Sequence, residues 1–284
     1  NATGSFMWTG GKLGGGGGQF TTGPGSIVTL APVSNSLKLG RDWQNQGFVT
    51  WQGANGRDLV IAEGATLVNA LGGVVTLVAA EGSNIRGKGS FANDGTLNMN
   101  GTGLTAIGAP FTNGPTGVLN VNSGTLQLKR SDTNEGAIGI ASGATLKVNG
   151  GYLNNGTVWG NGTLDPDGQG FTNLGVVAPG AASGAGIGTL TIRGDYYQGV
   201  TGVLSMGLGG TAAGLYDTLA VTGKVFLGGT LLTSAVNGYT PTAADSFTLL
   251  TYKSRSGQFA TLQAPPPLQL GADYEKRFGL FTLE

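Results

Sequence analysis

One short phrase returns through the middle of the chain, and its spacing limits the fold more than any other feature. The phrase pairs an aromatic residue with an asparagine two positions later and a glycine close behind, as in Phe91, Asn93 and Gly95. Its asparagines are Asn93, Asn113, Asn134, Asn154 and Asn173, which lie 20, 21, 20 and 19 residues apart. The third copy has Asp132 in place of the aromatic residue. A fixed period of roughly 20–50 residues indicates structural units that stack on one another.

The content of each repeat predicts strands rather than helices. A short apolar run follows the glycine, and a second run follows a Gly-Thr-Leu phrase such as Gly124–Leu126. Apolar and polar residues alternate in these runs, which is typical of a strand with one buried face. A leucine-rich repeat would need a different spacing of leucines and a helical segment. The repeat therefore predicts an all-β fold: a parallel β-helix (β-solenoid) with about 20 residues per coil, followed by a denser C-terminal capping region.

The repeated asparagines are expected to form a ladder, because equivalent side chains in successive coils of a solenoid lie over one another. An asparagine amide can bond the neighbouring coil, and its backbone tolerates left-handed angles. The following glycine is expected to supply a positive φ. Degenerate copies upstream add two members, so the predicted structural ladder contains Asn45, Asn69, Asn93, Asn113, Asn134, Asn154 and Asn173. We interpret these residues as architectural.

Composition argues against several classes of function. The chain has no histidine and no cysteine, so it lacks the most frequent general base, the most frequent zinc ligand and every thiolate site. Its formal net charge is zero, which removes the electrostatic attraction that nucleic-acid and anionic-membrane binding exploit. We therefore predict no catalytic, cofactor-binding or metal-binding residues and no nucleic-acid partner. The sequence also predicts no transmembrane segment, and we expect that a signal peptide has been removed.

The repeat divides the chain into two predicted domains. Degenerate coils begin near residue 19 and regular coils continue to residue 185, which gives a β-helix domain over 1–185. From 186 to 284 the strand-like runs are denser, which predicts a C-terminal cap. Within the first domain, Leu71–Ala80 is unusually apolar. We favour a strand buried on both faces there over a surface that a partner covers.

Four phrases near the C-terminus carry a family resemblance. They are Gly188–Tyr196, Tyr216–Gly223, Leu227–Leu231 and the pair Phe247–Leu250 with Gly257–Phe259. In order and spacing they resemble the C-terminal part of bacterial autotransporter passenger domains, which marks 186–284 as autochaperone-like, a region that assists folding. The resemblance implies a right-handed parallel β-helix exported to the cell surface of a Gram-negative bacterium. Passengers of this kind are normally followed by a translocating membrane barrel, and the sequence leaves open whether one follows residue 284.

The C-terminal end combines features that blunt a sheet edge with an apolar segment. Pro265–Pro267 cannot donate hydrogen bonds to a neighbouring strand, and charged residues gather in Asp273–Arg277. The segment Phe278–Leu283 follows them. One interpretation is a plug on the open end of the solenoid; the other is a strand that adds to another molecule. The residues predicted for such self-association are Phe278, Leu280, Phe281 and Leu283.

An enzymatic function on this scaffold would be expected to act on polysaccharide. Glycoside hydrolysis needs two carboxyl groups roughly 5–10 Å apart. The one close pair in the sequence is Asp165 with Asp167. The phrase around them reads first as a turn and second as a weak calcium loop. The autotransporter family hosts adhesins and enzymes alike, so the resemblance implies no catalytic residues.

Aromatic residues offer a second type of candidate site. Trp43 with Trp51, and Tyr196 with Tyr197, could form platforms for sugar, but stacking inside a β-helix explains them more simply. The sequence therefore predicts a non-catalytic secreted bacterial surface protein, adhesin-like or structural and self-associating. Its expected partners are further copies of itself and a surface glycan or host-cell receptor. The alternatives are a subunit of an extracellular filament that polymerises end to end, and a polysaccharide-active enzyme on a β-helix scaffold.

Overall fold

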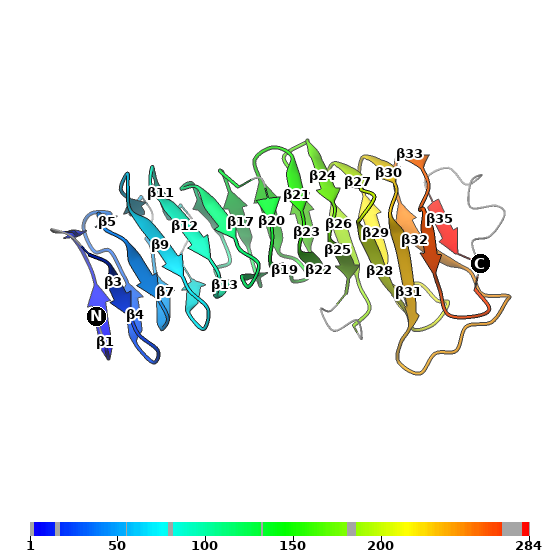
Figure 1. The fold of residues 1–284 in the computed structure, drawn as a ribbon, viewed down its shortest axis with the longest axis horizontal. Coiled ribbons are helices and arrows are strands. Elements are labelled where there is room, and N and C mark those ends of the chain that lie inside the picture. Colours follow the sequence, from blue (N-terminus) through cyan, green and yellow to red (C-terminus); the bar gives the residue numbers. More distant parts are fainter. Residues whose placement is uncertain are drawn as a thin grey trace. The chain divides into compact units, whose positions relative to one another are not determined.

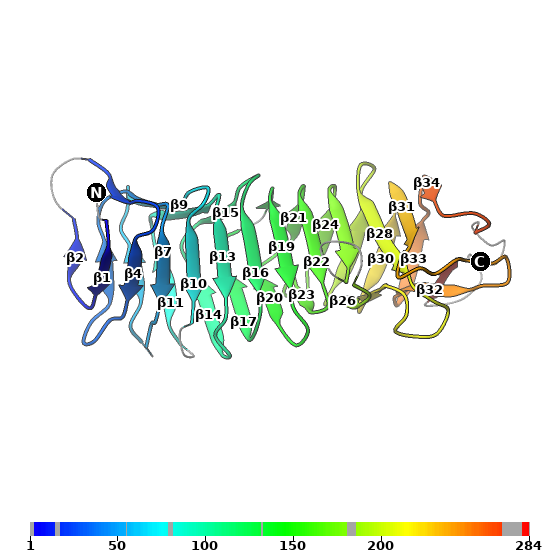
Figure 2. The same cartoon turned by 90° about the horizontal axis from the view of Figure 1, so that it is seen from below.

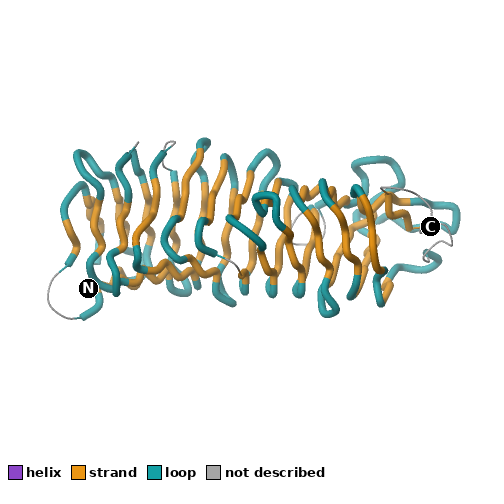
Figure 3. Tube along the Cα trace, turned by 90° about the horizontal axis from the view of Figure 1, so that it is seen from above, coloured by secondary structure: helices purple, strands orange, loops and turns teal. Residues whose placement is uncertain are grey.

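The computed structural model describes residues 3–14, 18–54, 56–78, 82–131, 133–180, 186–268 and 280–283. It divides into two compact units, Asn1–Asn149 and Gly150–Glu284. Strands and turns alternate throughout, and the described residues contain no helix (Figure 3). The predicted all-β parallel β-solenoid is confirmed, with about 22 residues per coil. The predicted domain boundary after residue 185 stays a prediction, and Asp132 lies outside the described residues.

In the first unit, three parallel sheets take one strand each from every coil (Figure 1). Sheet 1 contains β1 (Ser5–Trp8), β4 (Ile27–Leu30), β7 (Phe48–Trp51), β10 (Val74–Leu77), β13 (Thr96–Met99), β16 (Val118–Val121) and β19 (Ala137–Ile140). Sheet 2 contains β2 (Lys12–Leu13), β5 (Leu37–Leu39), β8 (Leu59–Ile61), β11 (Asn84–Gly87), β14 (Leu104–Ile107), β17 (Thr125–Leu128) and β20 (Thr145–Val148). Sheet 3 contains β3 (Phe20–Thr22), β6 (Trp43–Asn45), β9 (Thr66–Asn69), β12 (Ser90–Asn93), β15 (Phe111–Asn113) and β18 (Thr133–Asn134).

The second unit repeats the three-sheet arrangement. Its sheet 1 contains β22 (Thr157–Gly160), β25 (Val176–Pro179), β28 (Val203–Leu208), β31 (Thr230–Ala235) and β34 (Thr261–Gln263). Its sheet 2 contains β23 (Thr163–Asp165), β26 (Thr189–Ile192), β29 (Thr218–Val221), β32 (Phe247–Thr251) and β35 (Leu280–Leu283). Its sheet 3 contains β21 (Tyr152–Asn154), β24 (Gly170–Asn173), β27 (Asp195–Gln198), β30 (Lys224–Leu227) and β33 (Ser254–Gly257).

The core forms because equivalent apolar residues of successive coils pair in register. On sheet 1 of the first unit, Val75 pairs with Leu97, and Leu97 pairs with Leu119; all three side chains are buried. Figure 2 shows the strands of this sheet side by side, in the order in which the coils follow one another. Since burial of an aliphatic side chain contributes roughly 1.5–3 kcal/mol, each coil is stabilised mainly by the coils beside it.

The apolar segment Leu71–Ala80 is not a strand buried on both faces, and that prediction is wrong. Its strand β10 alternates, with Val75 and Leu77 buried and Val74 half-buried. Leu71 is 72% exposed and Val78 is 40% exposed, while residues 79–80 lie outside the described residues. A solenoid has an inside and an outside at every strand, so a run of apolar residues places half of them at the surface.

The repeated glycines have a different role from the one predicted. None of the described glycines at the repeat position, among them Gly117 and Gly136, has a positive φ, nor do the asparagines of the ladder. They are instead sites of close backbone approach. A Cβ atom on Gly136 would lie 2.3 Å from the carbonyl oxygens of both Gly114 and Gly117 in the preceding coil. The glycine therefore permits neighbouring coils to meet at the turn.

Candidate functional site

In the first unit the predicted asparagines form a buried column of hydrogen-bonded amides. Each Nδ2 atom donates to the Oδ1 atom of the asparagine one coil further along the chain. The donor–acceptor pairs are Asn45 to Asn69 (2.9 Å), Asn69 to Asn93 (2.8 Å), Asn93 to Asn113 (2.8 Å) and Asn113 to Asn134 (2.8 Å). At the start of the column, the Thr22 hydroxyl donates to Asn45 Oδ1. Amides aligned in one direction polarise one another, which strengthens the chain of bonds.

The second unit holds its own stretch of the column. Asn154 Nδ2 donates to Asn173 Oδ1 at 2.8 Å, and Asn173 Nδ2 donates to Gln198 Oε1 at 3.1 Å. The buried Tyr196 hydroxyl also donates to Gln198. Burial raises the pKa of Tyr196, which keeps the phenol neutral. Every asparagine predicted for the ladder is thus buried inside a unit and bonded, so its amide is not accessible to a ligand.

Most of the candidate aromatic platforms are also inside the fold. Trp43, Trp51 and Tyr196 are fully buried, and Trp43 Nε1 donates to the Thr22 hydroxyl. Tyr197 differs, because it is 37% exposed on the outer face of β27 and stacks on Phe226 with ring centroids 4.5 Å apart. An outward pair stacked along the sheet presents ring edges rather than a broad face.

The carboxyl pair Asp165 and Asp167 occupies a turn. The Asp167 backbone N–H donates to Asp165 Oδ1 at 3.0 Å, and Asp167 has φ 53°. Arg193 lies 3.8 Å from the Asp165 carboxylate. Among the described residues no group of three or more acidic side chains is placed to hold a metal ion. The geometry is that of an Asx turn, in agreement with the first interpretation of this phrase.

The C-terminal strand pairs within the chain. β35 (Leu280–Leu283) lies antiparallel to β32, with Leu280 opposite Thr251 and Leu283 opposite Phe247. Of the residues predicted for self-association, Leu280, Phe281 and Leu283 belong to this strand, whereas Phe278 lies outside the described residues. Pairing of β35 with another molecule stays a prediction.

Asp217 links two of the phrases that carry the family resemblance. Its buried carboxylate accepts the backbone N–H of Gly188 at 2.8 Å and that of Gly207 at 2.7 Å. Burial raises the pKa of Asp217 to about 6, although these two hydrogen bonds act in the opposite direction. The carboxyl therefore holds a proton in the folded chain at pH values where it is already ionised in the unfolded chain.

This pKa predicts that stability falls as the pH rises. Between about pH 4 and pH 6 the unfolded chain releases the Asp217 proton and the folded chain retains it, so the free energy of unfolding should decrease by roughly 2–3 kcal/mol and then level off. Urea denaturation from pH 4 to pH 7 measures this slope. The Asp217→Asn variant should show a flatter profile; an unchanged slope would assign the pH dependence to other groups.

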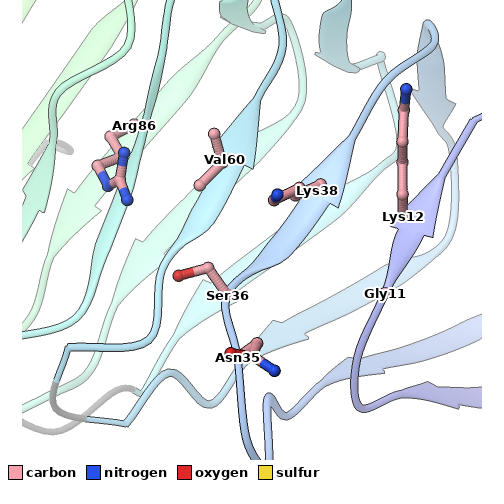
Figure 4. A pocket seen from close by; sticks show the side chains of 7 residues that line it. All are labelled: Gly11, Lys12, Asn35, Ser36, Lys38, Val60 and Arg86. Atoms are coloured by element: carbon pink, nitrogen blue, oxygen red, sulfur yellow. The ribbon is translucent and has the colours of Figure 1, made fainter.

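A hollow on the surface lies over sheet 2 of the first unit. It has a volume of about 670 Å³ and is lined by Gly11, Lys12, Asn35, Ser36, Lys38, Val60 and Arg86. Figure 4 shows that Lys12, Lys38, Val60 and Arg86 come from successive strands of the sheet. The strand register places Lys12 opposite Lys38, Lys38 opposite Val60, and Val60 opposite Arg86. We call this hollow the sheet 2 groove.

Charge in the sheet 2 groove is predominantly positive. Asp58 is buried and bonds the Arg86 guanidinium, and its other oxygen accepts from Asn84 at 3.0 Å. No acidic side chain lines the groove itself, among the residues that the structure describes. The groove can therefore attract an anionic ligand, but its lining offers no pair of carboxyl groups for acid–base chemistry.

The groove was missed in the sequence because its residues do not share a fixed spacing. Lys12, Lys38 and Arg86 are brought together by coils of unequal length. A local signal did exist. Lys38 stands between Leu37 and Leu39, both buried, so alternation alone places it on the outside of its strand.

Comparisons with known proteins provide no family for this chain: no family model matches the sequence, and no curated protein matches it. In the described part of the chain, no helix is long and apolar enough to cross a membrane.

Proposed function

We propose that this chain is a non-catalytic bacterial surface protein, adhesin-like or structural, whose solenoid displays ligand-binding outer faces. The observation that supports the proposal is that the repeated polar side chains lie inside the solenoid, whereas the charged side chains of the sheet 2 groove lie on its outer face. The repeated asparagines are buried in the hydrogen-bonded columns. The sheet 2 groove is lined by lysine and arginine side chains and has no pair of carboxyl groups. Such a surface suits binding rather than bond cleavage.

Export by a Gram-negative cell, in the manner of an autotransporter passenger, belongs to the same proposal. It is supported by the β-solenoid fold and by contacts between the phrases that resemble that family. Asp217 of the second phrase accepts from Gly188 of the first, and Asp195 of the first phrase accepts at 2.8 Å the backbone N–H of Lys224, the residue that directly follows the second phrase. These bonds join the capping coils to one another, as expected of a region that assists folding.

A binding screen combined with a degradation assay tests the proposal. The purified chain should bind a subset of immobilised glycans or bacterial cells, and prolonged incubation should release no new reducing ends from the bound polysaccharide. A catalytically competent polysaccharide lyase or hydrolase serves as the positive control for release. Sustained release of reducing ends by the chain would replace the adhesin-like function with the enzyme alternative.

Self-association is a second candidate function, favoured by an apolar row on sheet 1 of the first unit. Ile27, Phe48 and Val74 lie opposite one another on the outer face of β4, β7 and β10. Ile27 is 50% exposed and Phe48 is 52% exposed. Adjacent large apolar side chains at the surface are typical of a face that another molecule covers, and a second copy of the chain is the occupant that we propose.

The double variant Ile27→Thr, Phe48→Thr should weaken this association about tenfold or more, because each change removes apolar surface from the contact. Threonine is β-branched and therefore suits a strand at both positions. Sedimentation velocity over a concentration series measures the effect. The matched control is Thr29→Ser with Thr50→Ser on the adjacent outward row of the same strands, which should leave association unchanged. If the wild-type chain sediments as a monomer at all concentrations, this second function is rejected.

A further inference from the structure

The cations of the sheet 2 groove belong to a longer row that crosses the outer face of the first unit. Beyond Arg86 the next outward position is Gly108, and a Cβ atom there would lie 3.6 Å from Arg86 Cβ and 3.8 Å from Lys129 Cδ. Leu128 pairs with Ile107, which places Lys129 directly after Gly108 across the sheet. The row therefore reads Lys12, Lys38, Val60, Arg86, Gly108 and Lys129. We call it the cationic row.

The residues of the cationic row lie in a line across adjacent strands of sheet 2. At a strand spacing of about 4.8 Å, its five steps extend roughly 24 Å across the sheet. The charged residues of the row are exposed, namely Lys12, Lys38, Arg86 and Lys129. The uncharged residues Val60 and Gly108 lie between them and are half-buried. The one carboxylate bonded to the row is Asp58, among the contacts described, so positive charge predominates along its length. The nearby Lys88 and Glu63 pair with each other at 3.2 Å.

Two glycines pack against the side chain of Lys12, the first residue of the cationic row. Cβ atoms on Gly14 and Gly40 would lie 2.8 Å and 2.3 Å from Lys12 Cε, so the lysine stem lies closely against both glycines. The Lys12 ammonium group also lies beside Gly40, because a Cβ atom there would be 3.2 Å from Nζ. Lys12 and Lys38 are paired in register on adjacent strands, and a bound anion would offset the repulsion between their charges.

We propose that the cationic row binds an acidic polysaccharide, one that carries carboxylate or sulfate groups along a linear chain. This inference rests on the proposed binding function and names the ligand class of the same groove. A polysaccharide with one anionic group per sugar or per disaccharide spaces its charges more widely than double-stranded DNA, in which each strand carries one phosphate per about 3.4 Å of helix axis. The interrupted row of cations matches the wider spacing.

The other groups in the groove also suit a sugar chain. Val60 offers an apolar step for the C–H face of a pyranose ring, and Ser36 and Asn35 offer hydroxyl and amide groups at the groove wall. Proteins that bind single-stranded nucleic acid combine a positively charged groove with aromatic side chains on which the bases stack, and the lining residues of the sheet 2 groove include no aromatic side chain. Charge and lining together therefore favour a glycan.

The test is a binding titration of the full 284-residue chain on immobilised heparin, polygalacturonate and neutral dextran. We expect binding to at least one of the two acidic glycans, no binding to dextran, and a steep loss of affinity as NaCl is raised. The Lys12→Ala, Lys38→Ala variant should bind about tenfold more weakly, with a shallower salt dependence. The matched control is Lys224→Ala with Lys253→Ala, two exposed lysines of the second unit; its affinity should stay within about twofold of wild type.

The possible outcomes test the ligand class and the proposed binding function separately. If acidic glycans bind but the row variant equals the control, the row is not the site, while the adhesin-like function stands. Equal binding to dextran, or tighter binding to single-stranded oligothymidine or to phosphatidylserine vesicles, overturns the acidic glycan as ligand. If the chain binds no glycan, acidic or neutral, and no cell surface, the proposed function fails with it. Thermal denaturation of each variant checks that the fold is intact.

Discussion

Replacing Asn113 with aspartate should lower the free energy of unfolding by roughly 3–5 kcal/mol at pH 7. Asn113 is buried, and its Nδ2 donates to Asn134 Oδ1 at 2.8 Å and to the Ala137 carbonyl at 3.1 Å. Aspartate has the same shape, so no cavity forms. It has no amide donor, however, and places a carboxylate against the three oxygens that accept from the Asn113 amide, those of Asn134, Ala137 and Gly117, without a compensating cation.

The matched control is Asn120→Asp on the outer face of sheet 1. Asn120 donates to Asn98 Oδ1 at 2.9 Å, so it makes the same type of bond between coils, but its side chain is half-buried. Water can solvate a carboxylate there, and the expected loss is about 1 kcal/mol or less. Urea denaturation of both variants measures the contrast.

The pH dependence identifies the cause. A buried carboxyl in the column would have a raised pKa, so acidification should restore part of the stability of Asn113→Asp as the side chain gains a proton that it can donate. Asn120→Asp should show little recovery. Equal losses in the two variants, with no recovery at low pH, would mean that the column contributes no more to stability than a surface amide does.

The fold was predictable because every coil of a solenoid has the same basic structure. The spacing of Asn93, Asn113 and Asn134 predicts the coil, and alternation around Leu126 and Leu128 predicts which side chains point inward. Both signals are local, and they recur through the coils that carry the asparagine repeat. Tertiary structure adds only the stacking, which follows from the repeat itself.

Features that depend on the exact path of one coil were not predictable. The antiparallel return of β35 onto β32 follows a segment that departs from the repeat. The apolar run at Leu71–Ala80 was overinterpreted because composition does not show which residues of a run face outward. The cationic row depends on register between coils of unequal length, which places Arg86 beside Val60 although neither belongs to a repeated motif.

The repeated glycine is visible in the sequence, but the physical reason for it is visible only in the structure. The substitution Gly136→Ala tests that reason. Gly136→Ala should lower the free energy of unfolding by about 3 kcal/mol or more, because its Cβ would lie 2.3 Å from two carbonyl oxygens of the preceding coil. Neither oxygen belongs to a flexible side chain, so the coils themselves must separate.

The comparison that isolates close approach from backbone conformation is Gly143→Ala. Gly143 has φ 77°, and a Cβ atom at this position would have no heavy atom within 4 Å. Alanine there meets open space, so the change costs only the strain of a left-handed conformation, about 1–2 kcal/mol. Urea midpoints of the two variants should therefore differ clearly, with Gly136→Ala the less stable. If Gly143→Ala were the more damaging change, the role of the repeated glycine would lie in its dihedral angles, and contact between successive coils would not be what selects glycine at the turn.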